Sequence, residues 1–76
     1  MDVKSVASKV GIRDIIEVPS KLIEGKHALL FYFRDIPPII FLNKEDGEAE
    51  QLFSIAHEIF HYFFSKYKRK DMQLIA

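Results

Sequence analysis

Hydrophobic and polar positions in the second half of the chain repeat with the period of an α-helix. Placing residues 48–67 every 100° around an axis gathers the apolar side chains into one arc of about 180° and most polar side chains into the other. This pattern predicts an amphipathic helix of roughly 20 residues whose apolar arc faces the core. The apolar arc holds Leu52, Phe53, Ile55, Ala56, Ile59, Phe60, Phe63, Phe64 and Tyr67, and the polar arc holds Glu50, Gln51, Ser54, Glu58, His61, Tyr62 and Ser65.

Both ends of this predicted helix carry boundary signals. Residues 43–47 are turn-rich, and Asp46 or Gly47 can cap the first turn. Glu48 and Glu50 place negative charge where the helix dipole favours it. Residues 66–70 are basic except at one position, and we interpret them as a solvated helix end that complements the dipole, in preference to a contact with a polyanion.

The N-terminal segment predicts a short helix. Asp2 can cap it, apolar residues recur at helical spacing behind it, and Gly11 suits its C-terminal end. Residues 12–18 are ambiguous between a short strand and an extended connection, and residues 21–26 predict a loop or a single turn.

Two strand-like runs follow, at residues 27–33 and 39–42, both rich in aromatic and β-branched side chains. Residues 34–38 join them, and we expect Pro37 and Pro38 in the turn or at an edge because proline cannot donate to a strand ladder. The expected fold class is α+β: a short N-terminal helix, a small antiparallel sheet or hairpin, and a long C-terminal helix.

Composition limits the classes of protein that this chain can form. Its 76 residues make one small domain, and its lack of cysteine means that no disulfide stabilises it. The 49% hydrophobic content, with seven phenylalanines, predicts apolar surface that meets another chain, in an oligomer or with a completing partner. A formal net charge of zero argues against nucleic acid as a partner. We expect a cytoplasmic protein without a membrane span, because no secretory signal and no long apolar run is present.

The chemistry of the chain is concentrated in residues 57–61, His-Glu-Ile-Phe-His, an H-E-x-x-H pattern within the predicted helix. Two histidines four residues apart lie on one helix face, so both imidazoles can bind a single ion, and this pattern is typical of catalytic zinc sites. Glu58 projects about 100° away, too far round to share the ion but suitably placed beside metal-bound water. We therefore predict His57 and His61 as Zn²⁺ ligands and Glu58 as the catalytic base.

Other candidate residues are weaker. A catalytic zinc needs a third protein ligand, and His27 is the remaining histidine. A histidine that opens a strand is more often an ordinary surface or edge residue, and we expect that of His27. Tyr62 and Tyr67 could each donate to an oxyanion, but we expect Tyr62 to be solvent-exposed and Tyr67 to lie in the core.

The residues around the motif resemble the active-site helix of the ImmA/IrrE family of zinc metallopeptidases. Phe53, Ser54, Ile55 and Ala56 match in order the phenylalanine, Ser or Thr, aliphatic residue and alanine that precede the motif in that family, and residues 40–43 resemble the strand ending in asparagine before its helix. The resemblance implies one zincin-like metallopeptidase domain over residues 1–76, with the same ligand and base roles for His57, His61 and Glu58. It also implies protein substrates, often transcriptional repressors.

Two departures from that family stand out. Phe60 occupies a position where the family often has glycine. The third ligand of the family is a glutamate on a later helix, but no glutamate follows Glu58 here and Asp71 is the sole downstream carboxylate. A metzincin arrangement also fails, because Tyr67 stands where its third histidine would be. We therefore expect a domain truncated at its C-terminus or completed by another chain.

Two functions of different classes remain open at the level of sequence. The first is a zinc endopeptidase that hydrolyses a protein or peptide substrate, aligned by β-augmentation on an exposed strand edge such as residues 39–42. The second is a catalytically incomplete remnant that acts as a non-catalytic protein-interaction module. The intact Glu58 favours the first, and the missing third ligand favours the second.

Overall fold

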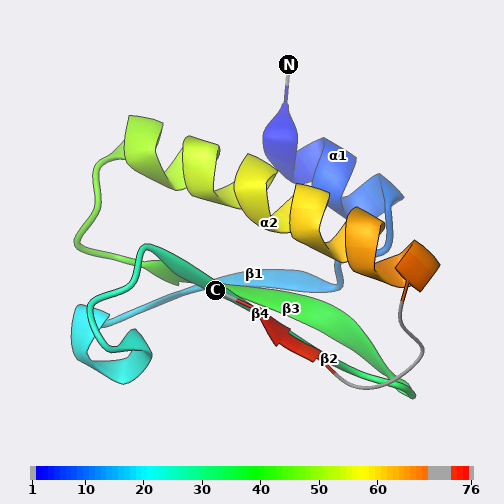
Figure 1. Ribbon diagram of the computed structural model, residues 1–76. Helices are drawn as coiled ribbons and strands as arrows, with labels where there is room; N and C mark the ends of the chain where they lie inside the picture. Colours follow the sequence, from blue (N-terminus) through cyan, green and yellow to red (C-terminus); the bar gives the residue numbers. More distant parts are fainter. Residues whose placement is uncertain (1, 69–72, 76) are drawn as a thin grey trace.

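The chain folds into two layers, a sheet and a pair of α-helices that both lie on one face of it (Figure 1). The computed structural model describes residues 2–68 and 73–75, with side chains described as far as residue 64. These observations confirm the expected α+β class. The elements are α1 (Val3–Lys9), β1 (Asp14–Val18), the 3₁₀ turn η1 (Ser20–Ile23), β2 (Ala28–Phe33), β3 (Ile36–Asn43), α2 (Glu48–Lys68) and β4 (Gln73–Ile75).

Helix α1 begins and ends as the sequence predicts. The carboxylate of Asp2 accepts hydrogen bonds from the backbone N–H groups of Lys4, at 3.1 Å, and Ser5, at 3.4 Å. After the C-cap residue Val10, Gly11 has φ +106, a conformation that glycine adopts without strain. The helix buries Ala7 against the core, and after Gly11 the chain continues into β1.

The described strands form one mixed sheet in the order β1-β3-β2-β4. Strands β2 and β3 form the expected antiparallel hairpin, and β4 adds to the other edge of β2. The ambiguous segment 12–18 contains β1, which pairs with β3 in parallel, from Asp14 opposite Ile39 to Val18 opposite Asn43. The expectation of a purely antiparallel sheet is therefore wrong, because a non-local pairing placed β3 at the centre.

Pro37 and Pro38 lie inside β3 and not in the turn, which consists of Arg34 and Asp35. Their position is nevertheless locally an edge. Strand β1 begins to pair with β3 only at Ile39, and the register of β2 against β3 shifts between Phe31 and Phe33. The missing N–H groups of the prolines therefore interrupt few ladder bonds, while the carbonyl of Pro38 accepts from Arg13 N at 2.7 Å.

The core lies between the sheet and the helices. Tyr32 and Tyr62 extend it at one end, with ring centroids 5.3 Å apart in an edge-to-face contact. Tyr62 is thus half-buried, and the expectation that it is solvent-exposed is wrong. The fully buried apolar residues of this cluster are Ala7, Ile12, Ala28, Leu30, Ile40, Leu42 and Ile55.

Helix α2 turns a different face to the sheet than its hydrophobic periodicity predicts. Ile55 and Ile59 pack on the core as expected, but Ser54 and Glu58 of the polar arc are buried beside them. Much of the apolar arc faces solvent, with Phe53 69% and Phe60 64% exposed. The side chain of Tyr67, expected in the core, lies outside the described residues. No helix in the described part of the chain has the length and apolar character needed to cross a bilayer.

Candidate metal centre

The start of α2 is held in place by Asn43, the last residue of β3. Its side-chain N–H donates to Ser20 Oγ at 2.9 Å and to the carbonyl of Lys26 at 3.0 Å, and its side-chain oxygen accepts from Glu45 N at 2.8 Å. Its backbone carbonyl accepts from Gln51 Nε2 at 2.9 Å. Asn43 is buried, and because these bonds join η1, the start of β2 and the first turns of α2, they fix where the motif helix crosses the sheet.

His57 and His61 project from α2 so that their Nε2 atoms converge. These two atoms lie 3.0 Å apart, and the rings are almost perpendicular, with centroids 4.5 Å apart. His57 is exposed and has the ring of Phe53 stacked beside it, with centroids 6.3 Å apart. Burial, and to a smaller extent His57, lowers the pKa of His61, which favours the neutral imidazole that a metal binds.

Glu58 points into the interior, between the helix and the sheet. It is only 2% exposed, and its Oε1 atom has no hydrogen-bond partner among the described residues. Burial raises the pKa of Glu58 to about 7, because the ionised carboxylate loses its hydration there. A carboxyl group that gains and loses its proton near neutral pH is suited to general acid–base chemistry.

A cavity of about 300 Å³ opens beside Glu58 and His57, between the start of β2 and α2. Its walls are mainly apolar. Lys26, His27 and Ala28 line it from the segment that enters β2, and Glu50, Phe53 and Ser54 line it from α2 together with His57 and Glu58. Sequence patterns gave no signal for the β2 side of this cavity, because only the fold brings residues 26–28 next to the motif.

His27 also lines the cavity, and it belongs to a separate charged group with Asp46 and Glu50. Its Nδ1 atom is 2.9 Å from Asp46 Oδ2 and 3.6 Å from Glu50 Oε2. The hydrogen bond to Asp46 and the charges of Asp46 and Glu50 raise the pKa of His27. The side chain is 64% exposed, so His27 is a surface residue held by an ion pair, in agreement with its expected surface position.

The third ligand predicted for a catalytic zinc is absent from the described part of the chain. The one group of three or more histidine, aspartate or glutamate side chains found there within reach of a single ion is His27, Asp46 and Glu50, which includes neither histidine of the motif. Asp71, the remaining candidate, lies outside the described residues. The structure thus brings His57, His61 and Glu58 together but does not bring His27 to them as a ligand.

Comparison with known proteins gives one match. A family model described as the IrrE N-terminal-like domain, Peptidase_M78, matches residues 7–74. No curated protein and no solved structure matches the chain. The matched segment begins in the last turn of α1 and includes β1, β2, β3, the whole of α2 and all but the last residue of β4, so it covers every side chain of the candidate site.

Proposed function

Because the chain belongs to the Peptidase_M78 family of IrrE N-terminal-like domains, we propose that it is built as a zinc metallopeptidase that hydrolyses peptide bonds in a protein substrate. The family also confirms the resemblance seen in the active-site helix. The observation that carries the proposal is the convergence of the Nε2 atoms of His57 and His61 beside a buried, unpartnered Glu58. A helix that served only for packing would gain nothing from such a carboxyl group.

The donor set fits a zinc ion. The two Nε2 atoms are close enough to bind one ion, since zinc–nitrogen bonds are about 2.0–2.1 Å long. Without an ion, the 3.0 Å contact is a hydrogen bond in which one neutral imidazole donates its Nε2–H to the Nε2 atom of the other; with the proton on Nδ1 of both rings, both Nε2 atoms are free to bind an ion. The unpartnered oxygen of Glu58 is available for a hydrogen-bond donor such as water in the adjoining cavity.

Within this proposal each side chain has a defined task. His57 and His61 hold the ion, and zinc, when bound, supplies a Lewis acid that activates water and polarises a carbonyl group. Glu58 accepts a proton from the attacking water and then donates it to the leaving amine. Its raised pKa suits both steps, because the carboxyl group can change protonation state near neutral pH.

The third ligand must come from outside the described residues. Asp71 is one candidate, and a carboxylate from outside residues 1–76, such as one supplied by a completing chain, is another. The exposed apolar arc of α2 supports the second source, since Phe53 and Phe60 flank the histidines and offer a surface on which such a segment can pack.

The substrate backbone is best placed along β2. The expected edge at residues 39–42 is excluded, because β3 is paired on both sides there. Strand β4 pairs with β2 only from Leu30 to Tyr32, which leaves the start of β2 unpaired on that side within the described residues. An extended peptide could pair with the start of β2, in line with β4 on the same edge of the sheet, and would then lie beside the cavity. Transcriptional repressors are candidate substrates, and a cytoplasmic location accords with them.

Zinc retention and cleavage, measured on the same preparations, test the proposal. The purified chain is loaded with zinc, dialysed and analysed for metal, and cleavage of an unstructured protein or a peptide library is followed by mass spectrometry. We expect wild type and Glu58→Gln to retain zinc, His61→Ala to lose it, and Glu58→Gln to lower cleavage at least 100-fold. Lys44→Gln, a change at an exposed position, serves as the matched control and should behave as wild type.

The alternative function predicts a different outcome of the same experiment. A wild-type chain that retains no zinc under metal-replete conditions, or a cleavage activity indifferent to Glu58→Gln, would argue against the peptidase. The exposed phenylalanines of α2 would then support a non-catalytic interaction module.

A further inference from the structure

The sheet is apolar on both of its faces. Strand β2 reads Ala-Leu-Leu-Phe-Tyr-Phe, and β3 continues from its prolines with Ile-Ile-Phe-Leu. A sheet with one face in water normally alternates apolar and polar residues, whereas unbroken apolar runs are typical of strands that are covered on both sides. The composition of β2 and β3 therefore indicates a second covering layer.

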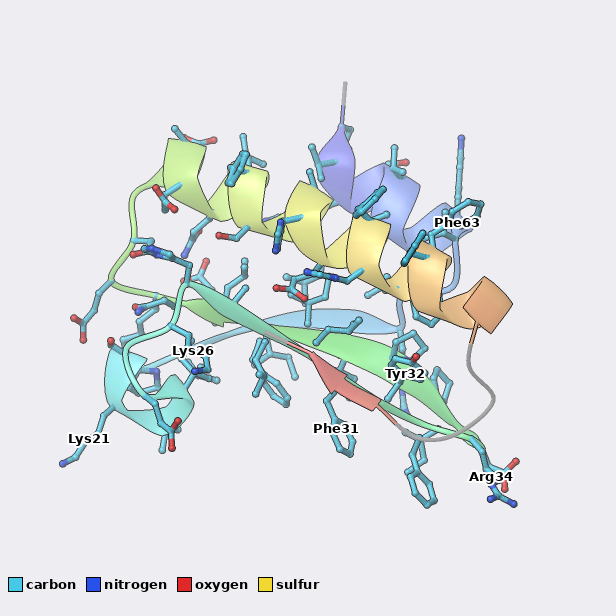
Figure 2. The ribbon with its side chains drawn as sticks, in the orientation of Figure 1. Lys21, Lys26, Phe31, Tyr32, Arg34 and Phe63 are labelled. Carbon is cyan, nitrogen blue, oxygen red and sulfur yellow. The ribbon has the colours of Figure 1, made fainter. Side chains whose placement is uncertain are left out.

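In the described part of the chain, the α-helices cover only one of these faces. Both α-helices lie on the same side of the sheet, where Leu30, Ile40 and Leu42 are buried (Figure 1). Figure 2 shows the consequence along β2: Tyr32 points toward α2, and its neighbour Phe31 points away from the helices. The molecule measures 32 × 28 × 16 Å, a slab with room for two layers and not for a third.

The residues on the uncovered side are defined by strand register. Phe31 is opposite Ile39, and Phe41 is opposite both Leu29 and Ile16 in the neighbouring strands. Ile16 is 38% exposed, and Leu29, Phe31, Ile39 and Phe41 are half-buried. This is expected for neighbouring side chains that pack against one another on one face of a sheet. We call this set the outer sheet face: Ile16, Leu29, Phe31, Ile39 and Phe41.

We propose that the outer sheet face is the interface of a homodimer, in which a second copy of the chain packs its own outer sheet face against it. The five residues carry no charge, so they do not favour a partner surface of positive or negative charge. An identical uncharged surface can pack against them without repulsion. Charged residues of both signs stand at the margin, with Asp14 at the start of β1 and Arg34 at the β2–β3 turn (Figure 2).

The size of the face suits a stable dimer. The broad side of the slab spans 32 × 28 Å, and a standard interface covers about 800 Å² on each partner. Two such sheets pack face to face about 10 Å apart, as in a β-sandwich, and the fully formed interface excludes water from all five side chains of each copy. The net charge of zero adds no long-range repulsion between the copies.

Sedimentation equilibrium of the full chain over a range of concentrations tests this proposal independently of any peptidase activity. We expect wild type to dimerise at micromolar concentrations, and Phe31→Lys to weaken association more than tenfold, because a two-fold interface carries the substitution twice. Ile16→Lys, at the edge of the same face, should weaken association in the same direction and is the second variant if Phe31→Lys folds poorly. Circular dichroism of each variant reports whether it is folded.

Leu52→Lys is the matched control, because it places the same charge on an apolar residue of the helical layer that is 38% exposed, as Ile16 is. It should leave association unchanged. A monomeric wild type at hundreds of micromolar would overturn the proposal. So would a dimer that survives Phe31→Lys and Ile16→Lys but dissociates with Leu52→Lys, since that result would place the interface on α2.

Discussion

Glu58 is both buried and a candidate for acid–base chemistry. Helical spacing assigns it to the polar side of α2, which by the usual rule would be the solvent side, yet it is 2% exposed with an unpartnered oxygen. Keeping a carboxyl group there opposes folding, because the ionised form is poorly solvated in the interior. Such a cost at one residue is typical of functional sites, where a local rule is broken for the sake of chemistry.

A prediction about pH follows from the raised pKa of Glu58. The unfolded chain releases this proton near pH 4.5 and the folded chain near pH 7, so the folded state binds more protons between these values. The free energy of unfolding of the metal-free protein should therefore fall as pH rises from 4.5 to 7. Glu58→Gln removes this titration, and at pH 8 it should stabilise the metal-free protein by on the order of 2 kcal/mol relative to wild type.

Urea unfolding at pH 4.5 and pH 8, with a chelator present, measures this effect. The advantage of Glu58→Gln should be small at pH 4.5 and large at pH 8. Glu17→Gln, at an exposed position of β1, is the control and should change the free energy of unfolding by less than about 0.5 kcal/mol at either pH. An advantage of Glu58→Gln that does not grow with pH would contradict the prediction.

His27 gives a second prediction for a single residue. Its pKa is raised first by the hydrogen bond from Nδ1 to Asp46, and then by the charges of Asp46 and Glu50. Asp46→Asn should lower the pKa of His27 by removing the hydrogen-bonded charge, and Glu50→Gln should lower it less, because its carboxylate is farther away, at 3.6 Å. Titration of the imidazole signals by NMR measures both, and equal effects of the two variants would refute the ranking.

At the scale of elements, the helices were predictable and the face of α2 was not. Local signals placed α1 behind Asp2 and began the long helix at Glu48, because caps and dipole charges act within a few residues. Periodicity predicted that Phe53 and Phe60 face the core, and they are the most exposed of the large hydrophobic side chains described on α2. The rule that the apolar stripe faces inward fails here because Ser54 and Glu58, and not these phenylalanines, are buried with Ile55 beside the sheet.

Sheet pairing could be predicted only where it is local. The β2–β3 hairpin has a two-residue turn and follows from composition. Strands β1 and β3 pair in parallel although η1 and all of β2 lie between them in the sequence. No feature of residues 12–18 predicts β3 as the pairing strand. For the same reason the proline segment could not be recognised as part of a strand, since the edge character that tolerates it depends on where β1 stops.

The junction between β3 and α2 yields a prediction of its own. Asn43→Ala removes three side-chain hydrogen bonds at a buried position and leaves the carbonyl of Lys26 with one bond fewer. We expect a loss of about 2–4 kcal/mol in the free energy of unfolding, from lost bonds and newly unpaired groups. Thermal and urea unfolding measure this loss, and Lys44→Ala at the exposed neighbouring position should stay near wild type. Equal stability of the two variants would mean that Asn43 does not hold the junction.

At the scale of the whole molecule, spacing along one helix was enough to propose the candidate site, but not the residues that surround it. His57, Glu58 and His61 are selected by spacing on one helix, and the structure brings the two imidazoles together and buries Glu58 between the helix and the sheet. The cavity that adjoins them needs residues 26–28, which reach α2 only through the hairpin and the bonds of Asn43. A third ligand for the proposed zinc site could not be assigned from the sequence, because no glutamate follows Glu58 in residues 59–76.

Metal binding should be visible as a change in the stability of the whole molecule. An ion that binds the folded state and not the unfolded state adds about 2.7 kcal/mol when its concentration is 100 times the dissociation constant. Zinc should therefore raise the melting temperature of wild type by several degrees, and EDTA should reverse the rise. His57→Ala combined with His61→Ala should abolish the response, whereas His27→Ala should keep it. A response that depends on His27 instead would assign the zinc to the group with Asp46 and Glu50.

The central place of β3 in the sheet sets an order of events for a chain made from its N-terminus. Strand β1 is synthesised early but has no strand to pair with until β3 has left the ribosome. Strand β2 likewise cannot form its hairpin until β3 has been synthesised. The local hairpin can close first, and β1 then docks by closing a long loop across it. A chain that stops before Asn43 is therefore a client for chaperones and proteases and not a folding intermediate.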